Sequence, residues 1–177
     1  KMIHVAIRMH DGAADEQMED ELTNALHLTK PDIDFNDFRR ELFSPTEANI
    51  LVMLTAAKYM AGKNLEAIRI GEEILFALER SHSRLSDYKV LQINLAHNLS
   101  QILQDEGRYQ EALLYAKKAE NLSICGTEQF LLPEIEFSIA QILNNMKKRQ
   151  ESRMRMEALI PYMRLIGKKE MADLVQE

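Results

Sequence analysis

Apolar residues recur at helical spacing along most of the chain. The clearest case lies in the middle of the sequence, where two apolar series flank a single glycine, Gly107. The first series comprises Leu91, Leu95, Leu99, Ile102 and Leu103, and the second comprises Ala112, Leu113, Ala116, Ala119 and Leu122. Intervals of three and four residues place one apolar stripe on each of two helices, and Gly107 supplies the permissive backbone between them. No segment alternates as a strand does, so the pattern predicts an all-α chain of helical hairpins.

The hairpin recurs along the sequence. Residues 58–75 align with residues 103–120 at an offset of 45 residues when Gly62 is placed on Gly107. The other superposed pairs are Glu66 with Glu111, Ala67 with Ala112, Gly71 with Ala116 and Ile74 with Ala119. Small residues at Ala112, Ala116 and Ala119 let the second helix of the middle copy lie close against its neighbours.

A third, weaker copy follows. It places Lys148 at the glycine position, 41 residues after Gly107, and Arg153 where the first two copies have alanine. This copy keeps the apolar rhythm, but in that alignment it loses the small residues of the other two.

Start and stop signals divide the chain further. Ser44-Pro45-Thr46-Glu47 combines a capping serine, a proline at the first helical position and a glutamate at the third, so it predicts a helix from about Pro45 to Ala61. Ser86 is expected to cap the next long helix, Pro133 to mark a helix start and Pro161 to break a helix late. Upstream, residues 15–28 read as a helix.

These signals predict a single domain over residues 1–177 with about seven or eight helices. Its expected parts are N-terminal helices in 1–43, hairpins over 45–80, 86–124 and 133–166, and a C-terminal helix over 167–177.

The middle copy resembles a tetratricopeptide repeat. The residues that carry the resemblance are Asn98-Leu99-Ser100, Gly107-Arg108-Tyr109-Gln110-Glu111-Ala112-Leu113, Ala116 and Ala119. The copies are longer than the 34-residue consensus. Elongated repeats after an acidic helix look like the C-terminal domain of bacterial helix-turn-helix transcriptional regulators of the peptide-responsive, quorum-sensing (XRE) type. The resemblance implies a repeat domain that binds a short peptide and forms a homodimer. It also implies a DNA-binding domain upstream of Lys1, through which alone the protein would contact DNA.

Tetratricopeptide-like helical hairpins of this kind stack into a right-handed superhelix. The first helix of each hairpin then lines a concave groove. On the first helix of the middle copy, Asn94, Asn98, Gln101 and Asp105 form a polar stripe, with His97 and Gln104 beside it. Amide side chains both donate and accept hydrogen bonds, which suits the backbone of an extended peptide. The resemblance implies that Asn98 contacts that backbone. The competing interpretation is the solvated face of an amphipathic helix.

Corresponding positions in the neighbouring copies complete the expected groove. They are Asn49, Met53 and Tyr59 in the first copy, and Ile142 and Asn145 in the third. A peptide would then meet polar groups near the middle of the groove and apolar surface on either side.

Charge and composition limit the partners. The 177 residues carry 28 acidic and 22 basic side chains, a net charge of −6, which makes wrapping of a polyanion by this chain unfavourable. Residues 11–22 hold six acids and no base, whereas residues 147–170 hold eight bases against three acids. This polarity fits head-to-tail assembly, attraction of an acidic peptide, contact with DNA beside the upstream domain, or simply solvated faces. Five of the ten methionines lie from Met146 onward, a soft surface suited to dimerisation.

Other chemistry finds no support in the sequence. The five histidines form no i, i+4 pair and the one cysteine, Cys125, completes no zinc motif, so no metal or other cofactor is expected. No nucleophile-base constellation or glycine-rich phosphate loop is present, which argues against an enzyme. A lone cysteine and the lack of a membrane-spanning segment indicate a cytoplasmic protein. We therefore expect a peptide-binding, dimerising regulatory domain. The alternative is a stand-alone tetratricopeptide scaffold that docks segments of partner proteins.

Overall fold

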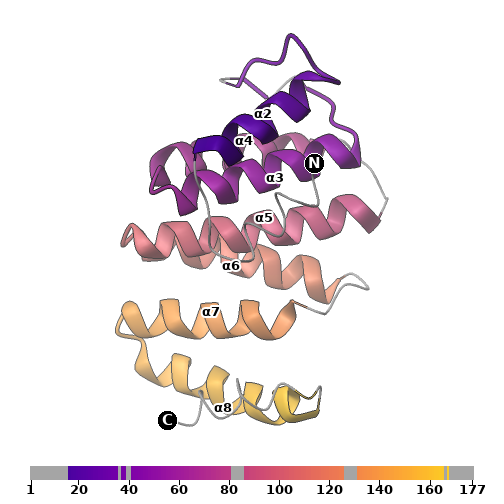
Figure 1. Ribbon diagram of the computed structural model, residues 1–177. Helices are drawn as coiled ribbons and strands as arrows, with labels where there is room; N and C mark the ends of the chain where they lie inside the picture. Colours follow the sequence, from indigo (N-terminus) through magenta and orange to yellow (C-terminus); the bar gives the residue numbers. More distant parts are fainter. Residues whose placement is uncertain are drawn as a thin grey trace.

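The computed structural model describes residues 16–35, 37–38, 41–80, 86–125, 131–165 and Gly167. Those residues contain seven α-helices and no strand, so the all-α prediction is confirmed (Figure 1). The helices are α2 (Glu16–His27), α3 (Pro45–Met60), α4 (Asn64–Arg80), α5 (Ser86–Asp105), α6 (Tyr109–Ile124), α7 (Leu132–Asn145) and α8 (Arg149–Leu165).

Three tight turns join the helices into hairpins, α3 with α4, α5 with α6 and α7 with α8. In each turn one residue adopts a left-handed backbone: φ is 75° at Gly62, 73° at Gly107 and 62° at Lys147. The amide of that residue donates to the carbonyl three residues back, and the next amide donates to the carbonyl five residues back. This is the Schellman pattern, which satisfies the last carbonyls of a helix.

The third copy therefore aligns on Lys147, and the sequence alignment on Lys148 was wrong by one residue. A left-handed backbone favours glycine, and glycine marks the other two turns in the sequence. Because the third turn has a lysine at this position, the sequence does not reveal where that turn lies. In the corrected alignment Ser152, not Arg153, stands where the other copies have alanine. Ser152 is 7% exposed and its hydroxyl donates to the Ala140 carbonyl at 2.7 Å, so the third copy keeps one of its small residues.

The start of α3 is as predicted, and the starts of α5 and α7 lie within one residue of the prediction. The Ser44 backbone amide donates to the Glu47 carboxylate at 2.8 Å and the Glu47 amide donates to the Ser44 hydroxyl, a complete capping box. Pro133 is the second residue of α7, and Ser86 is the first residue of α5 rather than the residue before it.

The expected break at Pro161 was wrong, because α8 continues through it to Leu165. Leu159 and Met163, on either side of the proline, are both buried. Packing on both sides holds the helix together although one backbone hydrogen bond is lost.

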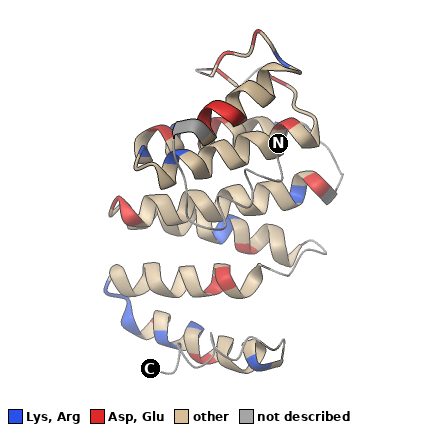
Figure 2. Cartoon of the chain, viewed as in Figure 1, with Lys and Arg blue, Asp and Glu red and all other residues tan. Residues whose placement is uncertain are grey.

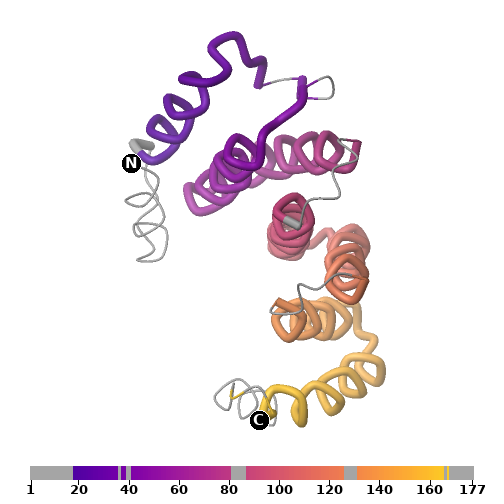
Figure 3. Tube along the Cα trace, turned by 90° about the vertical axis from the view of Figure 1, so that its right-hand side faces the viewer, coloured from indigo at the N-terminus to yellow at the C-terminus, as the bar shows by residue number. Residues whose placement is uncertain are grey.

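The first helices of the hairpins contact one another, α3 with α5 and α5 with α7. Gly71 of α4 brings the second helix close to this layer, since a Cβ at that position would lie 2.8 Å from Leu99 Cδ2 of α5. Seen from the side, the described helices follow an arc from α2 to α8 (Figure 3). In that view α5 and α7 lie on its inner side and α6 on its outer side.

The N-terminal part packs onto the first hairpin. Met18, Leu22 and Leu26 of α2 are fully buried. The described residues between 28 and 43 hold no further helix, although helices were expected in 1–43; there Phe35, Phe38 and Phe43 stack edge to face. Residues 1–15 and the expected C-terminal helix lie outside the described residues, apart from Gly167, whose φ of 82° follows the end of α8.

Candidate functional site

The corrected repeat alignment defines one stripe along the inner helices, which is exposed or partly exposed at every position except the buried Ser138. Each of α3, α5 and α7 contributes four positions at spacings of four, three and four residues, which place them on one helix face. We call these twelve positions the inner stripe: Asn49, Met53, Ala56 and Met60; Asn94, Asn98, Gln101 and Asp105; Glu134, Ser138, Gln141 and Asn145.

Six of the eight residues predicted for the groove belong to the inner stripe. Asn49, Gln101, Asp105 and Asn145 are exposed, while Asn94 and Asn98 are partly buried. Six of the twelve positions are amides, and the charged ones, Asp105 and Glu134, are both acidic. The stripe therefore presents amide donors and acceptors with little charge, which suits hydrogen bonding to a peptide backbone.

Tyr59 lies beside the stripe and joins two helices. Its hydroxyl donates to the Asp105 carboxylate, a contact between the end of α3 and the end of α5. That hydrogen bond, with burial, raises the pKa of Tyr59 to about 12, so the phenol stays protonated at neutral pH. Next to it, the Asn64 amide donates to the Glu106 carboxylate at 2.6 Å. These two bonds fix how the first hairpin sits on the second.

His97 lies inside the fold. Its side chain is buried, and Nε2 lies 2.9 Å from the Ser138 hydroxyl of α7. Burial lowers the pKa of His97 below its ordinary value although the nearby Glu134 carboxylate opposes this, so the imidazole is neutral at pH 7. Ile142 is also fully buried. Both residues pack between helices, where a ligand in the groove does not reach them.

A hollow of about 480 Å³ opens between the first turns of α3 and α5. Its lining residues are Pro45, Thr46, Asn49, Asp87, Val90 and Leu91. Asn49 was predicted from its repeat position, but Thr46, Asp87 and Val90 were missed. Thr46 and Val90 lie one helical turn before the predicted residues Asn49 and Asn94, and Asp87 lies two turns before Asn94. Continuing the stripe back to each helix start would have found them.

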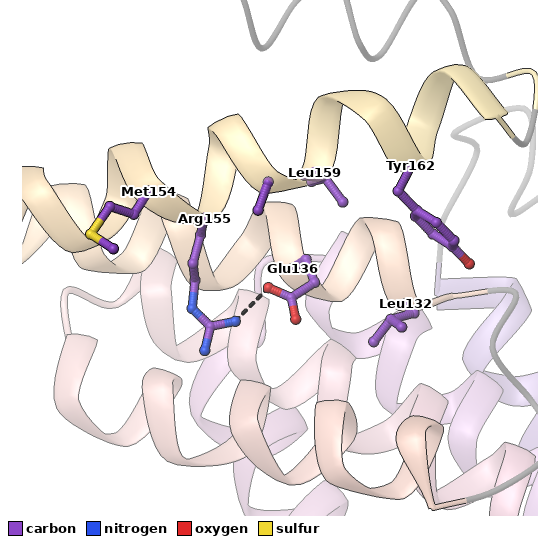
Figure 4. A pocket seen from close by; sticks show the side chains of 7 residues that line it. Leu132, Glu136, Met154, Arg155, Leu159 and Tyr162 are labelled. Carbon is purple, nitrogen blue, oxygen red and sulfur yellow. Dashed lines mark hydrogen bonds and ion pairs between the residues drawn. The ribbon is translucent and has the colours of Figure 1, made fainter.

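A second hollow, of about 510 Å³, lies between α7 and α8 (Figure 4), and no sequence pattern indicated it. Five of its lining residues are apolar or aromatic: Leu132, Met154, Ala158, Leu159 and Tyr162. The other two, Glu136 and Arg155, form an ion pair, and Arg155 also donates to Glu120 of α6 at 2.8 Å. Burial and the neighbouring Glu120 raise the pKa of Glu136 even though Arg155 opposes the shift.

The charge polarity read from the sequence is visible in the structure. Basic residues gather at the α7–α8 turn and along α8, and acidic ones on α2 (Figure 2). Glu19 of α2, however, pairs within the fold: Lys58 and Lys63 each lie 3.0 Å from its carboxylate. Burial would raise the pKa of Glu19, but these two partners outweigh it and lower the pKa. Part of the acidic surplus thus holds α2 on the first hairpin and does not face a partner.

Metal binding and membrane insertion can be judged only for the residues described above. Among them, His, Cys, Asp and Glu side chains nowhere gather in threes as a metal ion requires. Over the same ranges, each helix is too short or too polar to cross a bilayer.

Comparison with known proteins finds no matching family model, no matching curated protein and no matching solved structure.

Proposed function

We propose that this chain is a tetratricopeptide-like peptide-binding domain that uses the inner stripe to hold a short extended peptide or protein segment. The main support is the stripe itself: half of its positions on the three stacked first helices are amides, most of them on α5 and α7, and the Asn49 hollow lies at one end. A repeat array leaves such a face open because each hairpin packs only against its neighbours. In the proposal the hairpins follow a right-handed superhelix and the stripe lines its concave side.

The wider proposal follows the resemblance to peptide-responsive bacterial regulators. There the domain dimerises in the cytoplasm, and the bound peptide shifts the relative pose of two protomers and of DNA-binding domains upstream. The exposed side chain of Leu165 on α8 offers apolar surface for the dimer contact. The alternative is a stand-alone scaffold with no transcriptional role. A helix-turn-helix encoded before Lys1, together with a dimer whose sedimentation changes with peptide, favours the regulator; a peptide-independent monomer favours the scaffold.

Asn98→Ala tests the peptide site. A phage-displayed library of random short peptides supplies a binder to the intact chain, and calorimetry measures its affinity. We expect the substitution to weaken binding about tenfold, the loss of roughly one backbone hydrogen bond. The free energy of unfolding should change by less than about 0.5 kcal/mol, because Asn98 is partly exposed and no core contact is lost.

The matched control is Asn121→Ala, which removes an exposed asparagine from α6. It should change neither the affinity nor the stability. A library that yields no binder, or equal affinities for the parent and Asn98→Ala, would contradict the proposal.

A further inference from the structure

The hollow between α7 and α8 departs from the repeat pattern at named positions. In the hairpin before it, three polar side chains at the corresponding positions bridge to α4: Gln92 donates to the Leu78 carbonyl, Tyr115 donates to Glu72, and Lys118 pairs with Glu79. Their counterparts 40 residues on are Leu132, Arg155 and Ala158. Leu132 and Ala158 cannot form such bridges, so the space stays open and becomes apolar.

The same comparison singles out Glu136. It stands at the position of Ala96, which is fully buried in α5. An acidic side chain thus replaces an apolar one beside a mostly apolar hollow, and it lines that hollow from α7 while Arg155 lines it from α8 (Figure 4). Burying a carboxylate is costly unless it is paired.

Two carboxylates at this site share one guanidinium. One nitrogen, Arg155 Nη1, contacts both Glu120 and Glu136, so a single guanidinium serves two carboxylates. The side chains of Glu120 and Glu136 are only 14% and 21% exposed, which limits screening by solvent. An anion would have to displace one of these carboxylates from Arg155. A cation would instead stabilise the ionised form of Glu136, whose pKa is raised by burial and by the neighbouring Glu120.

From the open apolar hollow and the two carboxylates that share Arg155, we infer a binding site for a small amphiphilic amine. The apolar body of the ligand lies among Leu132, Met154 and Tyr162, and its ammonium group faces Glu136. A volume of about 510 Å³ is within the range of small-molecule sites. The inference is independent of the peptide site, which lies on the other side of the inner helices.

Three probes with one apolar body and different head groups test the site: 4-phenylbutylamine, 4-phenylbutanol and 4-phenylbutanoate. The intact chain carries carbon-13 methyl-labelled methionine, and the Met154 methyl signal, assigned by Met154→Leu, reports occupancy of the hollow. We expect the amine to bind about tenfold more tightly than the alcohol and the carboxylate to bind most weakly. The Met53 and Met60 signals of the inner stripe should not move.

Two variants make the result decisive. Glu136→Gln keeps the side-chain shape but removes the charge, so it should bring the affinity for the amine down to that for the alcohol. Ala158→Lys restores the lysine of the preceding hairpin and should abolish binding of all three probes, with folding checked by thermal unfolding. Equal binding of amine and alcohol to the parent chain, or no binding of any probe to it, would overturn the inference.

Discussion

At the scale of single residues, the three turns show what one position contributes. Each turn needs a left-handed residue, and the chain meets that need twice with glycine and once with Lys147. A left-handed backbone costs a side chain with a Cβ about 1–2 kcal/mol, part of which is offset by the greater freedom of glycine in the unfolded chain. The third turn therefore forms because the helices on either side of it pack, despite its own backbone preference.

Lys147→Gly should raise the free energy of unfolding by about 0.5–1 kcal/mol, because it relieves the left-handed strain and the Lys147 side chain is exposed. Urea denaturation measures the change. Lys148→Gly is the matched control: its φ is not positive, and it loses an exposed pair with Glu151 at 3.6 Å, so it should bring no gain. A gain for Lys148→Gly and none for Lys147→Gly would restore the alignment suggested by the sequence.

At the scale of helices, the spacing of apolar residues was sufficient to predict the helices. It was insufficient to predict which of their polar side chains are buried and which are exposed. Asn98 and His97 are neighbours on α5, yet one faces solvent and the other the interior. The difference depends on Ser138 of α7, which lies 41 residues from His97 in the sequence. A hydrogen bond between the Ser138 hydroxyl and the imidazole allows His97 to be buried. Likewise Pro161 reads as a helix break until the packing of Leu159 and Met163 is known.

The contact between α5 and α7 should depend on pH through His97. Its pKa in the fold is below the ordinary value of 6.5, so the unfolded chain binds a proton more readily than the folded one. The stability from this group is therefore complete above about pH 6.5 and declines as the pH falls, with a slope of at most about 1.4 kcal/mol per pH unit.

Urea denaturation at about pH 7.5 and about pH 5.5 tests this dependence. The parent chain should lose more stability between the two than His97→Gln, whose amide stays within reach of Ser138 and does not titrate. Most carboxylates remain ionised over this interval and contribute equally to both chains. Equal losses for the two proteins would show that the folded chain accepts the proton on His97 without cost.

At the scale of the whole molecule, the chain is a stack of hairpins with two candidate binding sites, the inner stripe and the hollow between α7 and α8. The α5 part of the inner stripe could be predicted, because its polar residues recur along one helix face. In α7 only Asn145 was predicted, because Lys147 hides the turn and the third copy was aligned one residue too late. The hollow between α7 and α8 could not be predicted, since it arises where Leu132 and Ala158 fail to repeat the bridges of Gln92 and Lys118, and those bridges are visible only in three dimensions.

The central claim is that a peptide binds along the inner stripe. Methionine methyl signals test it most directly, because Met53 and Met60 belong to the inner stripe of α3 whereas Met154 lines the other hollow. Each signal is assigned by a single methionine-to-leucine substitution, and the probe is the peptide selected from the library. Saturating peptide should shift the Met53 and Met60 signals and leave that of Met154 in place. A shift of Met154 with Met53 and Met60 unmoved would contradict it.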